Sequence, residues 1–533
     1  MDKVIIAIVF ALYMLLMIGI GVFFYIKKKN DADAYLLAGR SLNPWVASMS
    51  AQASDMSGWL LTGLPGLACS ITLASVGAAK EAIWTAIGLL IGTMLNWIFV
   101  GKRLRVYTEI LGDSQTLPEY FQNRFEDKKG ILRAVSSLII LVFFTVYTAS
   151  MFSASAKLFN SVFGLDYTIA LVVGAIIIVS YVFLGGFLAI SYTDLIQGLL
   201  MFFTLTIIPF VLMGKLDANQ TQNLDIIISN IGNILPNANN DISAITIISC
   251  LGWGLGYCGM PHILVRFMAT KDKRVFKPAT VISGVWAVIT LTAAIFIGIM
   301  GAVYVPELQD KENVFMAVVG KLFHPVLAGI MLSAVLAAIM STADSQLLVA
   351  STAFANDFYK VALRKNASNK EIVWVNRITI IVVSVIALVI ALDPKSSIFT
   401  LVSYAWAGFG ASFGPLVLFS LYSKKITLKG AVASISTGAL TTIILFSLKA
   451  TGVVTSGFWM IYEILPGFLF ASVMLWIVSL IDKNGAKHLE NGFDNMIKEL
   501  KSSEAAVSKE SIILEDSAHQ DESVAVEVNN MNK

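Results

Sequence analysis

The sequence predicts an all-α membrane protein with about 13 transmembrane helices, and three observations lead to this fold class. The chain of 533 residues is 57% hydrophobic and only 14% charged, whereas about 25% of the residues in a typical soluble domain are charged. Apolar runs of about 18 residues or more recur along it, and each is long enough to cross a bilayer as a helix. Basic residues gather in alternate connections between these runs, as expected for loops on one side of a membrane.

The expected spans follow one another from the amino terminus. They are 3–26, 42–68, 82–101, 134–159, 167–188, 193–213, 244–265, 279–304, 321–352, 373–392, 398–422, 430–449 and 456–481. The first span lacks a preceding basic segment and a following cleavage site, so it is interpreted as a retained helix and not a signal peptide.

Three segments outside the spans have a distinct composition. The loop at 102–133 is basic, and the polar loop at about 214–243 contains an apolar stretch at 224–228 that is too short to span, which predicts an interfacial helix. We expect one transmembrane transporter domain at 1–482. The tail at 483–533 is rich in Lys, Glu, Ser and Asn, which predicts a disordered or loosely helical cytoplasmic segment.

The distribution of basic residues predicts the orientation of the chain. If the loop after the first span is cytoplasmic, 24 of the Lys and Arg residues lie inside and 8 lie outside. Because loops rich in Lys and Arg stay in the cytoplasm, we expect the amino terminus outside and the carboxyl terminus inside. That arrangement requires an odd number of spans, and the expected number, 13, is odd.

Two of the expected spans are interrupted at corresponding positions. The second is broken at 55–58 by an acidic and two small residues, and the seventh by the glycine-rich segment 252–257 and by Pro261. Such paired interruptions indicate a transporter site between inverted repeats. The repeats would be five helices each, at about 42–213 and 244–422. The alternative is that the glycines only allow close packing of helices.

The broken spans supply candidate ligands for a sodium ion. Unwound backbone in a span is tolerated where its carbonyl groups line a cavity or meet a ligand. Carbonyl groups near Ala53 and Met56 are suitable ligands. Complementary candidates in the ninth span are the carbonyl group of Ala338 and the hydroxyl groups of Ser341 and Thr342. The alternative is that these hydroxyls only bind their own helix backbone.

Three acidic residues and one arginine are candidates for an ion pathway. Asp55 could bind the ion, hold the unwound segment, or lie just behind the ligands. Asp194 is expected at the cytoplasmic start of span 6, where it could pass ions inward or partner the helix dipole. Arg40 precedes span 2 on the inner side, where an interfacial arginine needs no further role. Asp344 is expected near the inner mouth and hydrated.

An organic substrate could bind beside the two breaks. Ser57, Gly58 and Trp59 begin a new half-helix, whose positive end could take a carboxylate. Trp253 and Tyr257 would supply flat apolar walls, and Pro261 extends the disruption of its span. The alternative is that these aromatic residues only pack or lie at the membrane interface.

The residue pattern favours a secondary transporter over an enzyme or a channel. The chain contains no G-x-x-x-x-G-K-[ST] motif, and its three cysteines and four histidines have neither metal-ligand nor redox spacing. No organic cofactor, nucleic acid or obligatory protein partner is expected, only membrane lipid. A channel would need a ring of filter segments, and a membrane enzyme would need clustered nucleophile and base residues; neither pattern is present.

Several motifs resemble one known family. They are GRSL at 39–42, SDMSGWLL at 54–61, LPEYF at 117–121, GGFLA at 185–189, GWGLGY at 252–257, PHIL at 261–264 and SYAWAGFG at 403–410. In order and over about residues 1–480, they resemble proline-transporting members of the sodium:solute symporter family. The resemblance implies two five-helix inverted repeats, a bacterial cytoplasmic membrane and Na⁺-coupled uptake of L-proline.

The resemblance also implies roles for individual residues. It implies Na⁺ ligands at Ala53, Met56, Ala338, Ser341 and Thr342, and roles in coupling or substrate binding at Asp55, Ser57, Arg40 and Asp194. Trp59, Trp253, Tyr257 and Pro261 would line or gate the proline site. The sequence Ala343-Asp344-Ser345 departs from the pattern and leaves the role of Asp344 open. The nearest alternative is the same machinery with pantothenate or a sugar as its solute.

Overall fold

The computed structural model describes residues 2–27, 37–182, 186–232, 234–236, 242–482 and 485–502. These residues are almost entirely helical. Within them no extended sheet is present, and Leu42 and Thr270 form an isolated parallel β-bridge. The predicted fold class, an all-α membrane protein, is therefore confirmed at this level.

Ten helical segments in the described part are long and apolar enough to cross a membrane. Some are extended by a short π-helical stretch, such as η2 (Asn96–Gly101) or η6 (Ala353–Leu363). The helices at their centres are α1 (Lys3–Lys27), α6 (Gly77–Leu95), α9 (Ile131–Phe163), α11 (Phe187–Met213), α15 (Phe276–Tyr304), α17 (Pro325–Thr352), α18 (Asn369–Ile390), α19 (Ile398–Tyr422), α20 (Leu428–Ala450) and α21 (Ile464–Ile481).

Two shorter elements and one bent pair account for the other three expected spans. Helices α13 (Ala244–Gly252) and α14 (Pro261–Met268), with η3 between them, form the bent pair. Helix α10 (Tyr167–Val182) has 16 residues. The second expected span is divided into α3, α4 and α5, whose bounds are Pro44–Asp55, Gly58–Leu61 and Gly63–Cys69. The count of 13 spans stays a prediction.

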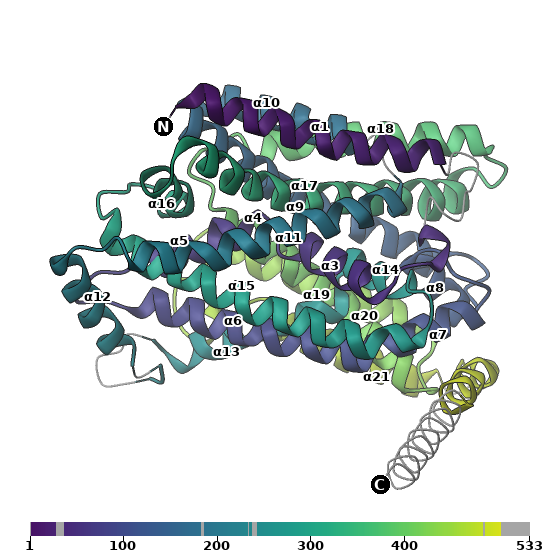
Figure 1. The fold of residues 1–533 in the computed structure, drawn as a ribbon. Helices are drawn as coiled ribbons and strands as arrows, with labels where there is room; N and C mark the ends of the chain where they lie inside the picture. Colours follow the sequence, from purple (N-terminus) through teal and green to yellow (C-terminus); the bar gives the residue numbers. More distant parts are fainter. Residues whose placement is uncertain are drawn as a thin grey trace, which may run out of the picture.

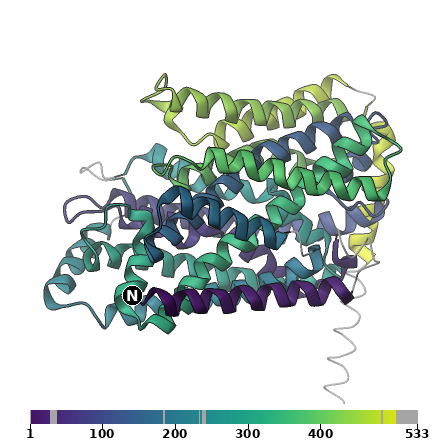
Figure 2. The ribbon, with the colours of Figure 1, turned by 90° about the horizontal axis from the view of Figure 1, so that it is seen from above.

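The helices form a bundle with roughly aligned axes (Figure 1). Helix α1 lies at one side of the bundle, and α20 and α21 lie at the opposite side (Figures 1 and 2). The amino terminus and α12 (Ala218–Ile231) are at one end, whereas α7 (Lys102–Ile110) and α8 (Leu117–Arg124) are at the other. The broken helices α3, α4 and α14 lie within the bundle and are buried.

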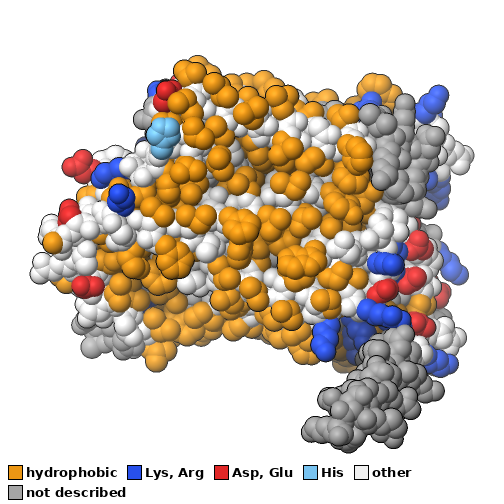
Figure 3. All heavy atoms as spheres, in the orientation of Figure 1, with side chains coloured by type: hydrophobic (Ala, Val, Ile, Leu, Met, Phe, Trp, Pro, Cys, Tyr) orange, Lys and Arg blue, Asp and Glu red, His pale blue; other side chains and the backbone are white. Residues whose placement is uncertain are grey.

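The surface agrees with a membrane-embedded bundle. Hydrophobic side chains cover a broad middle belt of the face shown in Figure 3, and charged side chains gather at its two ends. Helices α1 and α18 also expose apolar residues, among them Val4, Leu12, Ile378 and Val385. Such a belt is stable in contact with lipid and would be unusual on a soluble monomer.

Three sequence expectations are corrected in their boundaries. The basic loop expected at 102–133 contains α7 and α8. Helix α11 begins at Phe187, earlier than the expected 193. The ninth expected span, 321–352, is divided because α16 (Val314–Leu322) ends before Pro325 begins α17. A proline has no N–H to donate and is suited to the first turn of a helix.

The beginning of the tail is ordered against the bundle. Residues 490–502 are helical, and Met496 and Phe493 are buried, with the Phe493 ring 6.4 Å from that of Tyr107. Lys273 pairs with Glu499 at 2.7 Å. The tail, for which a disordered or loosely helical segment was expected, is helical in this part, and residues 503–533 lie outside the described residues.

Candidate functional site

The first break lies where the sequence places an acid, a serine and a glycine inside an apolar run. Helix α3 ends at Asp55, and Met56 leaves the helical conformation with φ −78° and ψ 68°. Ser57 then caps α4 by accepting a hydrogen bond from the backbone N–H of Trp59 at 3.4 Å. Serine is a favoured cap because its hydroxyl satisfies a free N–H of the first turn. The interruption expected at 55–58 is present.

Helix α17 crosses beside the end of α3. The Ser341 hydroxyl donates a hydrogen bond to the carbonyl oxygen of Ala53 at 2.7 Å, and the Thr342 hydroxyl lies 3.5 Å from the same oxygen. The Ser341 oxygen is also 3.3 Å from the Ala338 carbonyl oxygen. The structure therefore brings together four of the five predicted ligands, and Met56 follows Ala53 at the break. All five are buried.

The carboxyl group of Asp55 points toward the second broken span. It is 1% exposed, and its Oδ2 accepts a hydrogen bond from the Tyr257 hydroxyl at 2.8 Å. Its Oδ1 has no hydrogen-bond partner among the residues that the structure describes. The Trp59 indole donates to the Asp55 carbonyl oxygen at 3.2 Å. Asp55 thus connects the two breaks, whereas its contact with an ion stays a prediction.

The second break is longer than the first. A 3₁₀-helical segment, η3 (Trp253–Gly259), separates α13 from α14, and the axes bend by 45°. Close approach of α6 requires the glycines here: a Cβ at Gly254 would lie 2.4 Å from the Gly88 carbonyl oxygen. A larger residue would push the two segments apart. The interruption expected at 252–257 is therefore present, and its glycines serve packing as well as unwinding.

Side chains from other helices bind the carbonyl groups of the second break. The Trp406 indole N–H donates to the Trp253 carbonyl oxygen at 2.7 Å. The Asn96 side-chain amide donates to the Tyr257 carbonyl oxygen at 3.0 Å. A buried carbonyl group without a partner is costly in a membrane-embedded region. These two donors therefore stabilise the unwound segment.

Aromatic rings meet between the two breaks. The ring centroids of Trp59 and Trp253 are 6.5 Å apart, and those of Trp253 and Phe399 are 5.0 Å apart. Tyr462 stacks against Trp253 at 5.2 Å. Trp59 and Trp253, two of the predicted substrate residues, are thus neighbours, and Ser57 and Gly58 begin the helix that carries Trp59.

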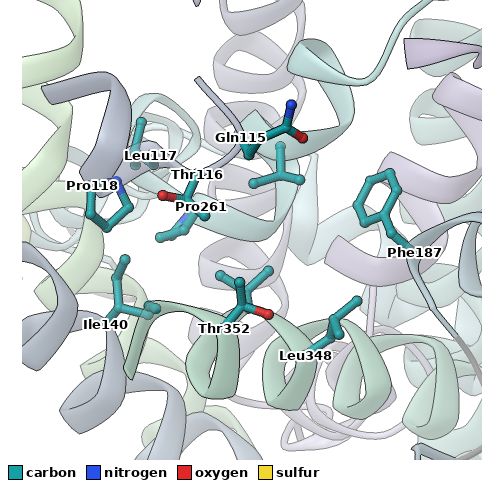
Figure 4. A pocket seen from close by; sticks show the side chains of 12 residues that line it. Gln115, Thr116, Leu117, Pro118, Ile140, Phe187, Pro261, Leu348 and Thr352 are labelled. Carbon is teal, nitrogen blue, oxygen red and sulfur yellow. The ribbon is translucent and has the colours of Figure 1, made fainter. Parts of the chain in front are cut away.

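Pro261 does not lie with these walls. It begins α14, beyond the far end of η3 from Trp253. It lines a different cavity of about 30 Å³, large enough for one or two water molecules. The side chains around this cavity come from several helices and include Thr116, Pro118, Ile140, Phe187, Leu348 and Thr352 (Figure 4). The structure therefore separates Pro261 from the other predicted substrate residues.

Arg40 joins several segments at the end of the bundle that carries α7 and α8. Its guanidinium donates to Asp113 at 2.5 Å and to the Met268 carbonyl oxygen at 2.6 Å. It also reaches the Ser114 carbonyl oxygen at 3.1 Å. Arg40 is therefore a cross-link between the start of α3, the α7–α8 connection and the end of α14, a role that the interfacial interpretation did not include.

The position expected for Asp194 is wrong. It lies beyond the first turn of α11 and is fully buried, so it is not a partner of the helix dipole. Its Oδ2 accepts hydrogen bonds from the Ser50 hydroxyl at 2.6 Å and from Arg266 at 3.0 Å. Arg266, on α14, is equally buried. The sequence expectation failed because the burial of Asp194 depends on a guanidinium from a distant part of the chain.

The expectation of a hydrated Asp344 is also wrong. Asp344 is fully buried, with its Oδ1 3.2 Å from the Ser345 hydroxyl oxygen. The Ser345 hydroxyl in turn lies 2.8 Å from the Ser341 carbonyl oxygen and 2.5 Å from Arg266. A polar cluster therefore continues from the Ala53 carbonyl group to the Arg266–Asp194 pair.

The sequence predictions missed several buried polar and aromatic residues near the breaks. Trp406 and Asn96 bind carbonyl groups of η3. His262 packs against Tyr147 with ring centroids 6.4 Å apart. No spacing rule marks these residues, because each comes from a different helix and is brought to the breaks only by packing.

Comparison with known proteins gives a consistent assignment. The sodium:solute symporter family matches residues 35–438. The sodium/proline symporter of Escherichia coli is 44% identical over 496 residues, which cover 91% of this chain and 94% of that protein. The sodium/proline symporter of Staphylococcus aureus is 41% identical over 497 residues, which cover 92% and 95%.

Two solved structures share the fold. A substrate-bound, outward-open Na⁺-coupled sialic acid symporter superimposes with a TM-score of 0.70 and 19% identity, over 90% of this chain and 98% of that one. A nucleobase-cation-symport-1 family transporter in a closed conformation gives 0.50 and 11%, over 86% and 98%. The fold, the family match and the identity to curated relatives agree: the chain belongs to the sodium:solute symporter family.

Proposed function

We propose that this protein is a Na⁺-coupled symporter that imports L-proline across a bacterial cytoplasmic membrane by alternating access. The observation that carries the proposal is the 44% and 41% identity to sodium/proline symporters over 91% and 92% of the chain. The amino terminus is outside and the carboxyl terminus is in the cytoplasm. The transporter domain is 1–482, with 13 spans and inverted repeats at about 42–213 and 244–422.

Sodium is the ion that is carried. Its ligands are the carbonyl oxygens of Ala53, Met56 and Ala338 with the hydroxyl oxygens of Ser341 and Thr342. The distance of 2.7 Å between the Ser341 hydroxyl and the Ala53 carbonyl oxygen supports this set. A hydroxyl group has lone pairs as well as a proton, so it can release the carbonyl group and offer its own oxygen to the ion.

Proline binds between the two breaks. Its carboxylate takes the positive end of the half-helix that starts at Ser57 and Gly58, and its ring lies between Trp59 and Trp253 near Tyr257. The Ser57 hydroxyl caps this helix only weakly, at 3.4 Å from the Trp59 nitrogen. This supports the replacement of the hydroxyl by the proline carboxylate. Pro261 lies on the inner exit path, next to the small cavity that it lines.

Asp55, Arg40 and Asp194 support coupling in different ways. Asp55 connects the sodium break to the proline break through the Tyr257 hydroxyl. Arg40 and Asp194 hold the inner ends of the moving helices through their contacts with Met268 and Arg266.

The sodium gradient supplies enough energy for concentrative uptake. One charge that crosses about 100 mV contributes roughly 2.3 kcal/mol, and a tenfold sodium gradient adds about 1.4 kcal/mol. Together, about 3.7 kcal/mol could sustain a proline gradient of roughly 500-fold.

Uptake by reconstituted protein tests the proposal. We expect radiolabelled proline to accumulate in liposomes under an inward Na⁺ gradient, and K⁺ in place of Na⁺ to abolish accumulation. Uptake that is unchanged by K⁺ would refute the coupling. Saturable uptake of another solute without competition by proline would refute the substrate and leave the family assignment intact. In the same assay, unchanged Na⁺ dependence in the Asp55→Asn variant would refute a role of Asp55 in coupling.

A further inference from the structure

The hydrogen bond between Trp406 and the second break joins α19 to η3. Trp406 is on α19, is 1% exposed, and donates its indole N–H to the Trp253 carbonyl oxygen at 2.7 Å. Because an indole has one donor and no acceptor for this bond, the ring orientation is determined by the carbonyl group that it meets. The bond therefore sets the backbone position of Trp253 relative to α19.

Helix α19 also holds the side chain of Trp253. The ring of Phe399 lies 5.0 Å from that of Trp253. Phe399 and Trp406 are seven residues apart, which places them on one face of α19 two turns from each other. Trp253 is thus held at its carbonyl group by one residue of α19 and at its ring by another. Its position follows that of α19.

Gly256 allows this contact. A Cβ at Gly256 would overlap the Trp406 indole, at 1.9 Å from its Nε1. The glycine therefore serves the approach of the indole, besides any role in unwinding the span. The Trp406 ring is also 5.1 Å from the Tyr257 ring in an edge-to-face arrangement.

We propose that Trp406 is a positioning residue that holds Trp253 in place as a wall of the solute site and so sets the affinity for the organic substrate. This inference rests on the proposed function, with proline as that substrate. Trp406 makes its hydrogen bond and these ring contacts with Trp253 and Tyr257 of the second break. The sodium ligands lie on α3 and α17, so sodium affinity is left nearly unchanged.

Trp406→Phe tests the proposal, because it removes the N–H donor and keeps an aromatic ring. We expect the KM for proline to rise about fivefold to tenfold, the cost of one buried hydrogen bond. The Na⁺ concentration for half-maximal uptake should stay within about twofold. Proline should also raise the Tm of the purified variant less than that of the wild type.

Trp286→Phe is the matched control. Trp286 is also buried and donates to a backbone carbonyl oxygen, that of Gly198, at 3.3 Å, but this bond joins α15 to α11 beside Ala53 of the first break and not at the second. We expect an unchanged KM for proline. An equal rise of KM in both variants would overturn the proposal, because the effect would then belong to any lost buried hydrogen bond. An unchanged KM in Trp406→Phe would overturn it as well.

Gly256→Ala approaches the same contact from the other side. The added methyl group displaces the indole, so we expect a rise of KM at least as large as in Trp406→Phe. In the double variant the two effects should not add, since both remove one interaction. Full additivity would overturn the proposal. If Gly256→Ala does not fold, Trp406→Phe with its control decides alone. Wild-type protein without Na⁺-dependent proline uptake would instead refute the proposed function.

Discussion

The two breaks in the bundle differ in the groups that meet their free carbonyl oxygens. At the first, the Ala53 carbonyl oxygen accepts from the hydroxyl of Ser341, with that of Thr342 nearby. At the second, the carbonyl oxygens of Trp253 and Tyr257 accept from the N–H groups of Trp406 and Asn96. Both breaks are buried. At each, these donors satisfy backbone carbonyl groups that would otherwise be unpaired in an apolar region.

The two breaks differ in the chemistry of their donors. A hydroxyl group can turn its proton away and offer lone pairs to a cation, whereas an indole N–H can only donate. The first break can therefore exchange a hydrogen bond for a sodium ion. The second keeps its shape through fixed donors and presents the ring of Trp253. We therefore propose that the ion binds at the first break and that the second supplies a ring wall for the organic substrate.

The largest effect is expected from Ser341→Ala, which removes the hydroxyl closest to the Ala53 carbonyl oxygen. A hydrogen bond or ligand contact to a charged group contributes about 1.5 to 3 kcal/mol. We therefore expect the Na⁺ concentration for half-maximal proline uptake to rise about tenfold or more. At saturating Na⁺, the KM for proline should change less than about twofold.

Ser333→Ala is the control for this variant. Ser333 is buried in the same helix, and its hydroxyl donates to the Gly329 carbonyl oxygen of its own backbone at 2.8 Å. We expect no change in Na⁺ dependence. If Ser341→Ala changed the affinity for proline and not that for Na⁺, the assignment of the two breaks would be wrong.

A smaller effect on both affinities is expected from Tyr257→Phe. The Tyr257 hydroxyl donates to Asp55 at 2.8 Å and so connects the two breaks. Its removal leaves a buried carboxyl oxygen without this partner. We therefore expect the half-saturating concentrations of both Na⁺ and proline, measured by uptake kinetics, to rise about fivefold. Tyr120→Phe is the control, since its hydroxyl bonds Ser420 in a remote buried site. A change in one affinity alone would show that the breaks act independently.

Thr342→Val should have a weaker effect than Ser341→Ala. The variant keeps the branched shape and removes a hydroxyl that lies 3.5 Å from the Ala53 carbonyl oxygen, at the limit of a hydrogen bond. We expect the half-saturating Na⁺ concentration to rise about twofold to threefold, with an unchanged KM for proline. A larger effect than that of Ser341→Ala, measured in the same uptake assay, would reverse the order of the two hydroxyls.

The smallest effect on transport is expected from Met496→Ala in the helix at 490–502. Met496 is buried against the bundle, far in sequence from both breaks. The loss of its side chain should release this helix locally, which amide hydrogen exchange detects as faster exchange within 490–502. Both half-saturation constants should stay within about twofold. A tenfold change in either would show that the tail acts on the breaks.

Local composition was sufficient to predict where the spans break. An aspartate, a serine and a glycine inside an apolar run, and several glycines followed by a proline in another, disfavour a continuous helix wherever they occur. The breaks at Met56 and at η3 are where these residues stand. Chemistry also made Ala53 and Ser341 candidate ligands of one ion, with the alternative that the hydroxyl only binds its own helix, and the structure shows it bonded to the Ala53 carbonyl oxygen.

Burial of individual side chains could not be predicted in the same way. Asp194 and Asp344 were expected near water, yet both are fully buried beside Arg266 and Ser345. Pro261 was expected to line or gate the substrate site together with Trp253, and the structure places it at a small cavity beyond the other end of η3. In each case the outcome depends on which distant helix packs alongside, and hydropathy along the chain carries no such information.

The sequence by itself determined that this chain forms a helical membrane bundle, where two of its spans unwind, and which family it belongs to, because these properties depend on local residue patterns. Only the tertiary structure decided which donors meet each unwound carbonyl group. Hydroxyls from α17 reach the first break, and N–H groups from α6, extended by η2, and from α19 reach the second. Hydrogen bonds act over about 3 Å, so partners hundreds of residues apart are determined by packing alone.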